Sequence, residues 1–201
     1  MKCLNLHTIV LASRNRGKAQ EFRSLLSPMA SRILTLEDLG LESLIQECGK
    51  SFAENARLKA LGYSQLVDLP VLADDSGLEV AALGGRPGIH SARYAGGNAS
   101  DADRIRKLLG ELEVSGNNRR ARFVCALALA QAGILLAQSE GTCEGEIALE
   151  PRGTNGFGYD PIFLLPELGK TFAELDESAK NQYSHRARAV HSLLDRLKEF
   201  H

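Results

Sequence analysis

Residues 70–78 read PVLADDSGL, an apolar run that leads directly into two adjacent acids. The apolar residues 70–73 predict a buried β-strand, with residues 74–77 at its carboxyl end. Ligands of α/β proteins gather at this edge of the sheet. Because neighbouring strand residues point to opposite faces, we expect one of the two carboxylates, Asp74 or Asp75, to enter a site. Such an oxygen ligand suits Mg²⁺, which commonly uses one or two carboxylates together with substrate phosphates.

Strands and helices alternate around this segment in the first half of the chain. Residues 8–12 and 32–36 predict two further short strands, separated by a helix. Ser51 and Glu54 have the spacing of a helix capping box, and the helix that they open is expected to end near residue 66. The side chains of this helix that are predicted to face the core are Leu58, Leu61 and Leu66.

The second half of the chain favours a β-meander. Residues 122–130 and 134–139 alternate enough to predict two long strands, which Ala132 and Gly133 join as a hairpin. Residues 144–149 predict another strand. Early alternation of strands and helices followed by a meander predicts an α/β protein with a mixed sheet covered by helices.

The composition is typical of a soluble globular protein, and a length of 201 residues predicts one domain over residues 1–201. Lys and Arg number 24 against 25 Asp and Glu, a balance that gives no support for nucleic-acid binding. The sequence lacks the patterns of a secretory signal and of a membrane span, so we expect no membrane partner and a cytoplasmic location. The cysteines lack metal-ligand spacing and are expected to be free thiols of a reducing compartment: Cys3, Cys48, Cys125 and Cys143.

The turn after the first predicted strand is a candidate phosphate site. It reads SRNRGK, residues 13–18, and leads into a helix whose N-terminal amides favour an anion. Lys18 adds a cation, and Asn15 can donate or accept a hydrogen bond. The turn is not a P-loop, because that motif needs Gly and Ser or Thr where this chain has Ala12 and Ala19. The alternative interpretation is a polar connection with a solvated lysine.

Two later segments carry further candidate residues. Residues 153–161 read GTNGFGYDP, in which the glycines let backbone approach a ligand and Phe157 and Tyr159 offer flat surfaces. The alternative is a tight hairpin whose aromatic rings cap the core. Near Ser184, where the last helix is predicted to start, three side chains would bind an anion or a keto oxygen, or serve the structure alone: Lys180, His185 and Arg186.

Six segments, taken in this order, resemble one family, the inosine triphosphate pyrophosphatases, which are also described as noncanonical purine nucleoside triphosphate (dITP/XTP) pyrophosphatases. The segments are Ser13-x-Asn15-x-x-Lys18; residues 51–60, SFAENARLKA; residues 73–78, ADDSGL; residues 83–94, LGGRPGIHSARY; residues 156–161, GFGYDP; and Ser184-His185-Arg186. The resemblance extends over nearly the whole chain. In the first segment the family more often has Thr and Gly where this chain has Ser13 and Arg14.

The resemblance implies an α/β fold with a central mixed β-sheet flanked by helices, two lobes with an intervening cleft, and a homodimer. It implies hydrolysis of ITP, dITP and XTP to the monophosphate and pyrophosphate with a divalent cation, usually Mg²⁺. Asp75 is implied as general base and metal ligand, and Glu47 as a second metal ligand. The residues implied to bind the nucleotide are Ser13, Arg14, Asn15, Arg16, Gly17, Lys18, Ser76, Phe157, Gly158, Tyr159, Asp160, Lys180, His185 and Arg186.

Base choice follows from hydrogen-bond chemistry if these side chains line the nucleotide site. Hypoxanthine and xanthine present a keto oxygen where adenine presents an amino donor, so a pocket of donors favours the first two bases. Two other functions stay open: a pyrophosphatase for modified pyrimidine nucleotides, and a non-catalytic nucleotide sensor. The presence of Lys18 and Asp75 argues against the sensor.

Overall fold

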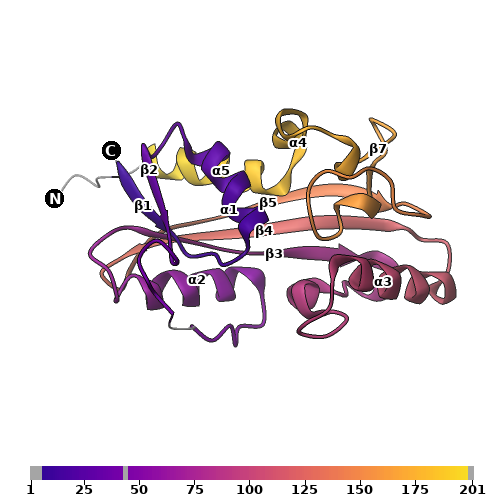
Figure 1. Ribbon diagram of the computed structural model, residues 1–201, viewed down its shortest axis with the longest axis horizontal. Coiled ribbons are helices and arrows are strands. Elements are labelled where there is room, and N and C mark those ends of the chain that lie inside the picture. Colours follow the sequence, from indigo (N-terminus) through magenta and orange to yellow (C-terminus); the bar gives the residue numbers. More distant parts are fainter. Residues whose placement is uncertain (1–5, 43–44, 199–201) are drawn as a thin grey trace. The chain divides into compact units, whose positions relative to one another are not determined.

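The computed structural model of the chain describes residues 6–42 and 45–198 (Figure 1). The strands are β1 (Thr8–Leu11), β2 (Arg32–Thr35), β3 (Val71–Val80), β4 (Arg120–Gln131), β5 (Ile134–Ile147), β6 (Phe163–Leu165) and β7 (Lys170–Thr171). The α-helices are α1 (Arg16–Leu26), α2 (Phe52–Tyr63), α3 (Asp101–Ser115), α4 (Glu177–Tyr183) and α5 (His185–Lys198). Short 3-10 helices are η1 (Ala81–Leu83), η2 (Gly88–Arg93), η3 (Asp160–Ile162) and η4 (Phe172–Glu174).

The strands form a mixed sheet in the order β2-β1-β3-β4-β5-β6-β7. β1 runs parallel to both β2 and β3, with Ile9 opposite Ile33 and Val10 opposite Val71. β5, β6 and β7 are antiparallel to their neighbours, as a meander requires. The predicted fold class, a mixed α/β sheet flanked by helices, is therefore confirmed.

The chain divides into two compact units, in agreement with the two predicted lobes. Unit 1 comprises the residues up to Asp75, Cys125–Gly141 and the residues from Arg186 onward. Unit 2 comprises Ser76–Val124 and Thr142–His185. Strands β3, β4 and β5 contribute residues to both units. A single functional domain over residues 1–201, and a cleft, stay predictions.

Unit 1 covers both faces of its part of the sheet with helices. In Figure 1, α1 and α5 lie on one side of the strands and α2 lies on the other. The apolar side chains packed with α1 and α5 include Ile9, Phe22, Leu127 and Leu193, which are buried. Helices cover both faces of β1 and of the first half of β3, so neither face is exposed to solvent. This explains why both strands are continuously apolar in sequence.

Unit 2 has a core of its own, centred on aromatic rings. The Phe123 ring lies 4.4 Å from that of Phe163 and 5.8 Å from that of Phe172, measured between centroids. Leu108 and Leu112 of α3 belong to the same buried cluster. Since each unit buries separate apolar surface, each can hold its own loops in place.

Helix α2 corrects one prediction from the sequence. Ser51 accepts a hydrogen bond from the Glu54 amide at 3.2 Å, as the cap predicts, but the Glu54 carboxylate accepts from the Lys50 amide. The predicted core face was wrong for Leu58, which is 37% exposed, and for Leu66, which is 49% exposed and follows the end of the helix, whereas Leu61 is half-buried. The residues that α2 buries are Phe52, Asn55, Ala56, Ala60 and Tyr63. The buried face thus combines two aromatic rings with two alanines and a polar amide, and Leu58 lies outside it.

Two strand boundaries also differ from expectation. β3 continues to Val80, so Asp74 and Asp75 lie within the strand and not at its carboxyl end. The parallel pairing with β1 ends at Leu72, but β3 also neighbours β4 and continues beside it. Residues 144–147 belong to the single long strand β5 and do not form a separate strand.

The described cysteines, Cys48, Cys125 and Cys143, are free thiols, and Cys3 lies outside the described residues. Burial raises the pKa of the Cys125 thiol far above its ordinary value. Among the described residues, no helix is both long and apolar enough to cross a membrane.

We predict that Ser100→Ala destabilises the protein through loss of the α3 cap. Ser100 accepts a hydrogen bond from the Asp103 amide at 3.2 Å, and Asp103 accepts one from the Ser100 amide at 3.1 Å. Removing such a cap costs about 1 kcal/mol of unfolding free energy, measurable by urea denaturation. Ser178→Ala, an exposed control in α4, should change that free energy by less than about 0.5 kcal/mol. Equal stabilities of the two variants would contradict the prediction.

Candidate active site

The turn between β1 and α1 presents backbone amides at the start of a helix. Asn15 is the N-cap of α1, and its side-chain oxygen accepts from the Lys18 amide at 3.0 Å. The Ser13 hydroxyl accepts from the Asn15 amide at 3.4 Å. Amides and the helix macrodipole at this end favour a bound anion. Arg16 and Gly17 form the first turn of the helix.

Arg14 connects the turn to the segment that follows β2, and its contact with a nucleotide stays a prediction. Its guanidinium donates to the carbonyl oxygens of Leu41 at 3.1 Å and Glu42 at 2.8 Å. These bonds fix the segment after β2 beside the turn. A cavity of about 290 Å³ lies between them, lined by residues 13–16 and by residues 35–37 and 40–42.

The two acids of β3 have different partners, as the alternation along a strand predicts. Asp74 is 1% exposed, and its Oδ2 lies 2.7 Å from the Nζ of Lys18. Asp75 is 7% exposed and accepts a hydrogen bond at 3.0 Å from the side chain of Asn55 in α2. The two carboxylates therefore connect β3 to two separate helices.

The environments of these acids shift their pKa values in opposite directions. Burial by itself raises the pKa of Asp74, but Lys18, Lys59 and Arg186 together hold it below its ordinary value. For Asp75, burial is the largest effect and raises the pKa, although Lys59 and Lys18 oppose it. Asp74 is therefore an anion held by cations, while Asp75 is the more basic carboxylate.

Lys59 is a cation that the sequence analysis did not assign to the site. Its Nζ lies 3.3 Å from Oε1 of Glu47, and its side chain is 12% exposed. Burial lowers the pKa of Lys59, but Asp74, Asp75 and Glu47 raise it more, so the net shift is upward. Asn55 was also missed. The signal was available, because positions 55 and 59 are one helical turn apart and lie on the same face of α2.

The residues of this group line a second cavity, of about 200 Å³. The lining residues are Ala12, Ser13, Arg14, Asn15, Lys18, Leu36, Ile45, Glu47, Lys59, Tyr63 and Asp74. Asp75 is not among them. The structure thus brings together the predicted turn, the predicted Glu47 and Asp74, which is one of the two candidate acids, and it adds Lys59.

In unit 2, Asp160 holds together two of the residues that the sequence predicted to bind the nucleotide, Phe157 and Lys180. Its Oδ2 accepts from the Phe157 amide at 2.9 Å and from the Nζ of Lys180 at 2.5 Å. The Lys180 ammonium lies 5.3 Å from the centre of the Phe157 ring. Gly156 has a φ of +74°, and a Cβ there would collide with the Asp160 carboxylate, so this position requires glycine.

The other predicted residues are placed apart from that loop contact. His185 is 1% exposed, and its ring stacks on Phe123 at 4.7 Å, within the core of unit 2. Arg186 belongs to unit 1, where its Nη1 donates to Glu21 at 2.8 Å. Ser76 is half-buried in β3. The structure therefore brings Lys180 to the 157–160 segment, whereas His185 and Arg186 contact other partners.

The site combines a lysine at a helix N-terminus with buried carboxylates and a second cation. This combination is typical of proteins that bind phosphorylated ligands. The chain belongs to the Ham1 family, whose family model matches residues 9–196. This membership agrees with the resemblance found in the sequence.

Individual relatives cover almost the whole chain. The dITP/XTP pyrophosphatase of Geobacillus kaustophilus (strain HTA426) is 52% identical over 192 residues, which are 95% of this chain and 94% of that protein. A solved HAM1 protein from Coxiella burnetii is 45% identical, with a TM-score of 0.85, over 96% of this chain and 98% of that chain. The Staphylococcus aureus Ham1 protein is 43% identical, with a TM-score of 0.85, over 96% and 100%.

We predict that Asn55→Asp destabilises unit 1. The Asn55 amide donates to Asp75 and its oxygen accepts from the Gly49 amide at 2.8 Å. A carboxylate at position 55 would lose the donor and face Asp75 with a like charge, at a cost of about 1–3 kcal/mol in unfolding free energy. Urea denaturation at neutral pH measures this loss. Arg57→Gln, on the exposed side of the same helix, is the control, and an equally small effect of both changes would refute the assignment.

Proposed function

We propose that this protein is a dITP/XTP pyrophosphatase, which hydrolyses noncanonical purine nucleoside triphosphates such as dITP, XTP and ITP to the monophosphate and pyrophosphate. Such an activity removes deaminated purine nucleotides from the nucleotide pool. Family membership and near-complete coverage of relatives with that name support the substrate class. A homodimer and a cytoplasmic location stay predictions.

One observation carries the proposal. Lys18 lies in the first turn of α1, and its Nζ is 2.7 Å from Asp74 of β3. Both residues line the cavity that Glu47 and Lys59 also line. A nucleoside triphosphate carries several negative charges, and it needs amides and cations on its oxygens. The capped N-terminus and the two lysines provide both. The turn formed by residues 13–18 would therefore bind the triphosphate.

Glu47 lines this cavity and Asp75 lies close enough to Glu47 to interact with it electrostatically, a pair that suits a divalent cation, and Mg²⁺ is our proposal. Among the described residues, no group of three or more His, Cys, Asp or Glu side chains could hold a metal. Mg²⁺ is commonly bound by one or two carboxylates and completed by substrate phosphates. Asp75 and Glu47 would hold it. When bound, the cation would supply Lewis-acid stabilisation of charge on the phosphate oxygens.

Asp75 is our candidate for general base. Its carboxylate is more basic than an ordinary aspartate because it is buried, and Asn55 holds it in one orientation. It would accept a proton from a water that attacks the α-phosphorus. The bond between that phosphorus and the bridging oxygen then breaks, and pyrophosphate leaves with the electron pair. Lys18 and Lys59 would stabilise the negative charge of the leaving group.

The purine base would be recognised by unit 2. Phe157 provides a ring for stacking, and Lys180 provides a cation near that ring. The last helix begins at His185, the final residue of unit 2, and the backbone amide there would be a further donor for a keto oxygen. A base that offers an amino donor at that position would leave these groups without a partner, at a cost of about 1–3 kcal/mol for each.

The first functional prediction concerns products and metal dependence. We expect pyrophosphate and a monophosphate from dITP in one step, with no diphosphate intermediate, and loss of turnover when EDTA removes divalent cations. Coupled detection of pyrophosphate and of orthophosphate, with and without inorganic pyrophosphatase, separates the two products. Orthophosphate released directly, together with dIDP, would contradict the proposed bond cleavage.

The second functional prediction is that Asp75→Asn retains the fold and loses most of kcat. The amide keeps the shape of the side chain but cannot accept the proton or carry the charge. Loss of a general base reduces rates by about 10²- to 10⁴-fold. Asp68→Asn, an exposed change of the same kind in unit 1, is the control and should leave kcat unchanged. If Asp75→Asn stayed within tenfold of wild type, Asp75 would not be the base.

A further inference from the structure

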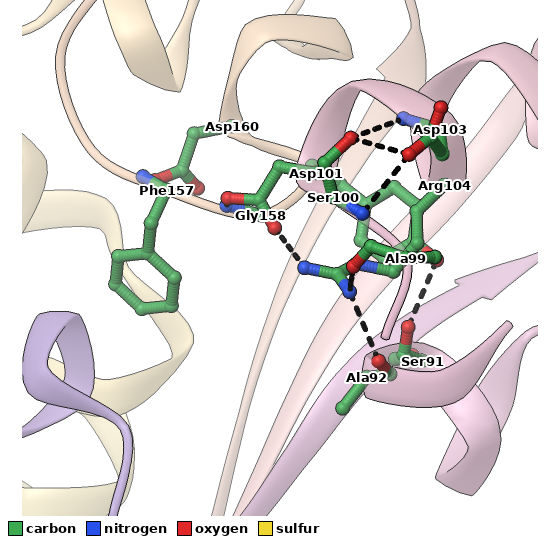
Figure 2. A network of polar contacts seen from close by, with 11 residues as sticks. Ser91, Ala92, Ala99, Ser100, Asp101, Asp103, Arg104, Phe157, Gly158 and Asp160 are labelled. Carbon is green, nitrogen blue, oxygen red and sulfur yellow. Dashed lines mark hydrogen bonds and ion pairs between the residues drawn. The ribbon is translucent and has the colours of Figure 1, made fainter. Parts of the chain in front are cut away.

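The segment that carries Phe157 is held from outside by helix α3 as well as by Asp160. The Gly158 amide donates to Oδ2 of Asp101, the first residue of α3, at 2.7 Å. Figure 2 shows Asp101 and Arg104 beside this segment, with Ser91 and Ala92 of η2 on their other side. Two consecutive amides, those of Phe157 and Gly158, therefore each donate to a carboxylate. The backbone at Phe157 is fixed on both sides.

Arg104 holds the Asp101 carboxylate in place. Its Nη2 pairs with Oδ1 of Asp101, while its Nη1 donates to the carbonyl oxygens of Ala92 at 3.1 Å and Ala99 at 2.6 Å. The guanidinium geometry allows these contacts at once, which an ammonium could not match. Because Arg104 contacts both Asp101 and the backbone of η2, the positions of η2 and α3 together determine where the Asp101 carboxylate meets the Gly158 amide.

A second set of hydrogen bonds connects the segment that carries Phe157 to η2 and, through η2, to β3. The Tyr159 hydroxyl donates to the Ser91 carbonyl at 3.0 Å, and the Ser91 hydroxyl accepts from the Leu78 amide in β3 at 2.9 Å. Tyr159 is 5% exposed and Ser91 is 7% exposed. Hydrogen bonds therefore fix the position of this segment relative to β3 as well as to α3.

Helix capping does not account for the Asp101 carboxylate. The capping box of α3 is made by Ser100 and Asp103, and Asp103 also pairs with Arg106 at 2.9 Å. Asp101 instead directs one oxygen to Arg104 and the other to Gly158. The two acids in the first turn of α3 have separate tasks, and only that of Asp101 reaches the 157–160 segment.

We propose that Asp101 is a positioning residue for recognition of the purine base: through the Gly158 amide it sets where the Phe157 ring lies. This inference rests on the proposed function, in which Phe157 stacks on the base. The chemistry uses carboxylates and lysines of unit 1, so a displaced ring weakens nucleotide binding more than it slows hydrolysis. Asp101 therefore contributes to KM and has little effect on kcat.

The test compares Asp101→Asn with Asp103→Asn. An aspartate accepts from two donors through two oxygens, whereas an asparagine has one acceptor and cannot satisfy both Arg104 and the Gly158 amide. We expect Asp101→Asn to raise KM for dITP about three- to tenfold, the effect of one lost hydrogen bond, with kcat within twofold. Asp103→Asn should leave KM unchanged, although it weakens the cap. Arg104→Lys, which loses the fork, should raise KM in the same direction.

A spectroscopic measurement tests the positioning without turnover. The chain has no tryptophan, so Phe157→Trp introduces a single reporter at the stacking position. In that background we expect Asp101→Asn to lower the fluorescence anisotropy of Trp and to weaken its quenching by dITP in the presence of EDTA. Asp103→Asn should change neither. Melting temperatures of all variants show whether each remains folded.

The outcomes separate the two proposals. If wild type releases pyrophosphate from dITP but Asp101→Asn and Arg104→Lys keep wild-type KM and anisotropy, the positioning role is wrong and the proposed function stands. Equal rises of KM in Asp101→Asn and Asp103→Asn would also overturn it, since they would reflect the helix alone. If wild type leaves dITP intact, the proposed function fails and the inference about the purine base fails with it. A raised KM and lowered anisotropy in Asp101→Asn alone would support it.

Discussion

The Asp74 carboxylate is almost completely buried, and a buried charge of this kind must be paired. Removing a carboxylate from water costs several kcal/mol, which Lys18 of α1 and Lys59 of α2 offset. In unit 1, the helices α1 and α2 must therefore both pack beside β3, because their lysines neutralise the buried charge of Asp74. The arrangement that satisfies this constraint also places two cations and the N-terminus of α1 beside one cavity, which is where we propose that phosphate binds.

In the proposed function, the residues that would bind phosphate and those that would contact the base belong to different units. The lysines and acids come from unit 1, while Phe157 and Lys180 come from unit 2, which has a separate apolar core. Both groups use the same device, a carboxylate that holds a functional neighbour: Asp74 holds Lys18, and Asp160 holds Lys180. Asp101 likewise holds the backbone of the 157–160 segment through the Gly158 amide. Loops built in this way are ordered before a ligand arrives, which reduces the entropy lost on binding.

The sequence predicted most elements correctly where local chemistry decides them. The cap at Ser51 and the hairpin after Gln131 lie where their residues indicate. The errors arose where packing overrides pattern. α2 buries Ala56 and Ala60 together with Phe52 and Tyr63 and exposes Leu58, because packing against the rest of the chain decides which face of the helix is covered. β3 extends past its acids, because its neighbour β4 continues beside it, and the polarity of residues 74–76 gave no sign of that partner.

The order of the six motifs determined the family, the fold class and the residue types available for chemistry, because each motif is short and its meaning is local. The tertiary structure decided which carboxylate meets which cation. Asp74 and Lys18 are 56 residues apart, Asp101 and Gly158 are 57 apart, and Arg186 and Glu21 are 165 apart. Such pairs leave no local signature, since any acid of the right kind would look the same in the sequence. They are fixed by the packing of strands and helices, which brings one particular carboxylate within hydrogen-bond distance and leaves the others in water.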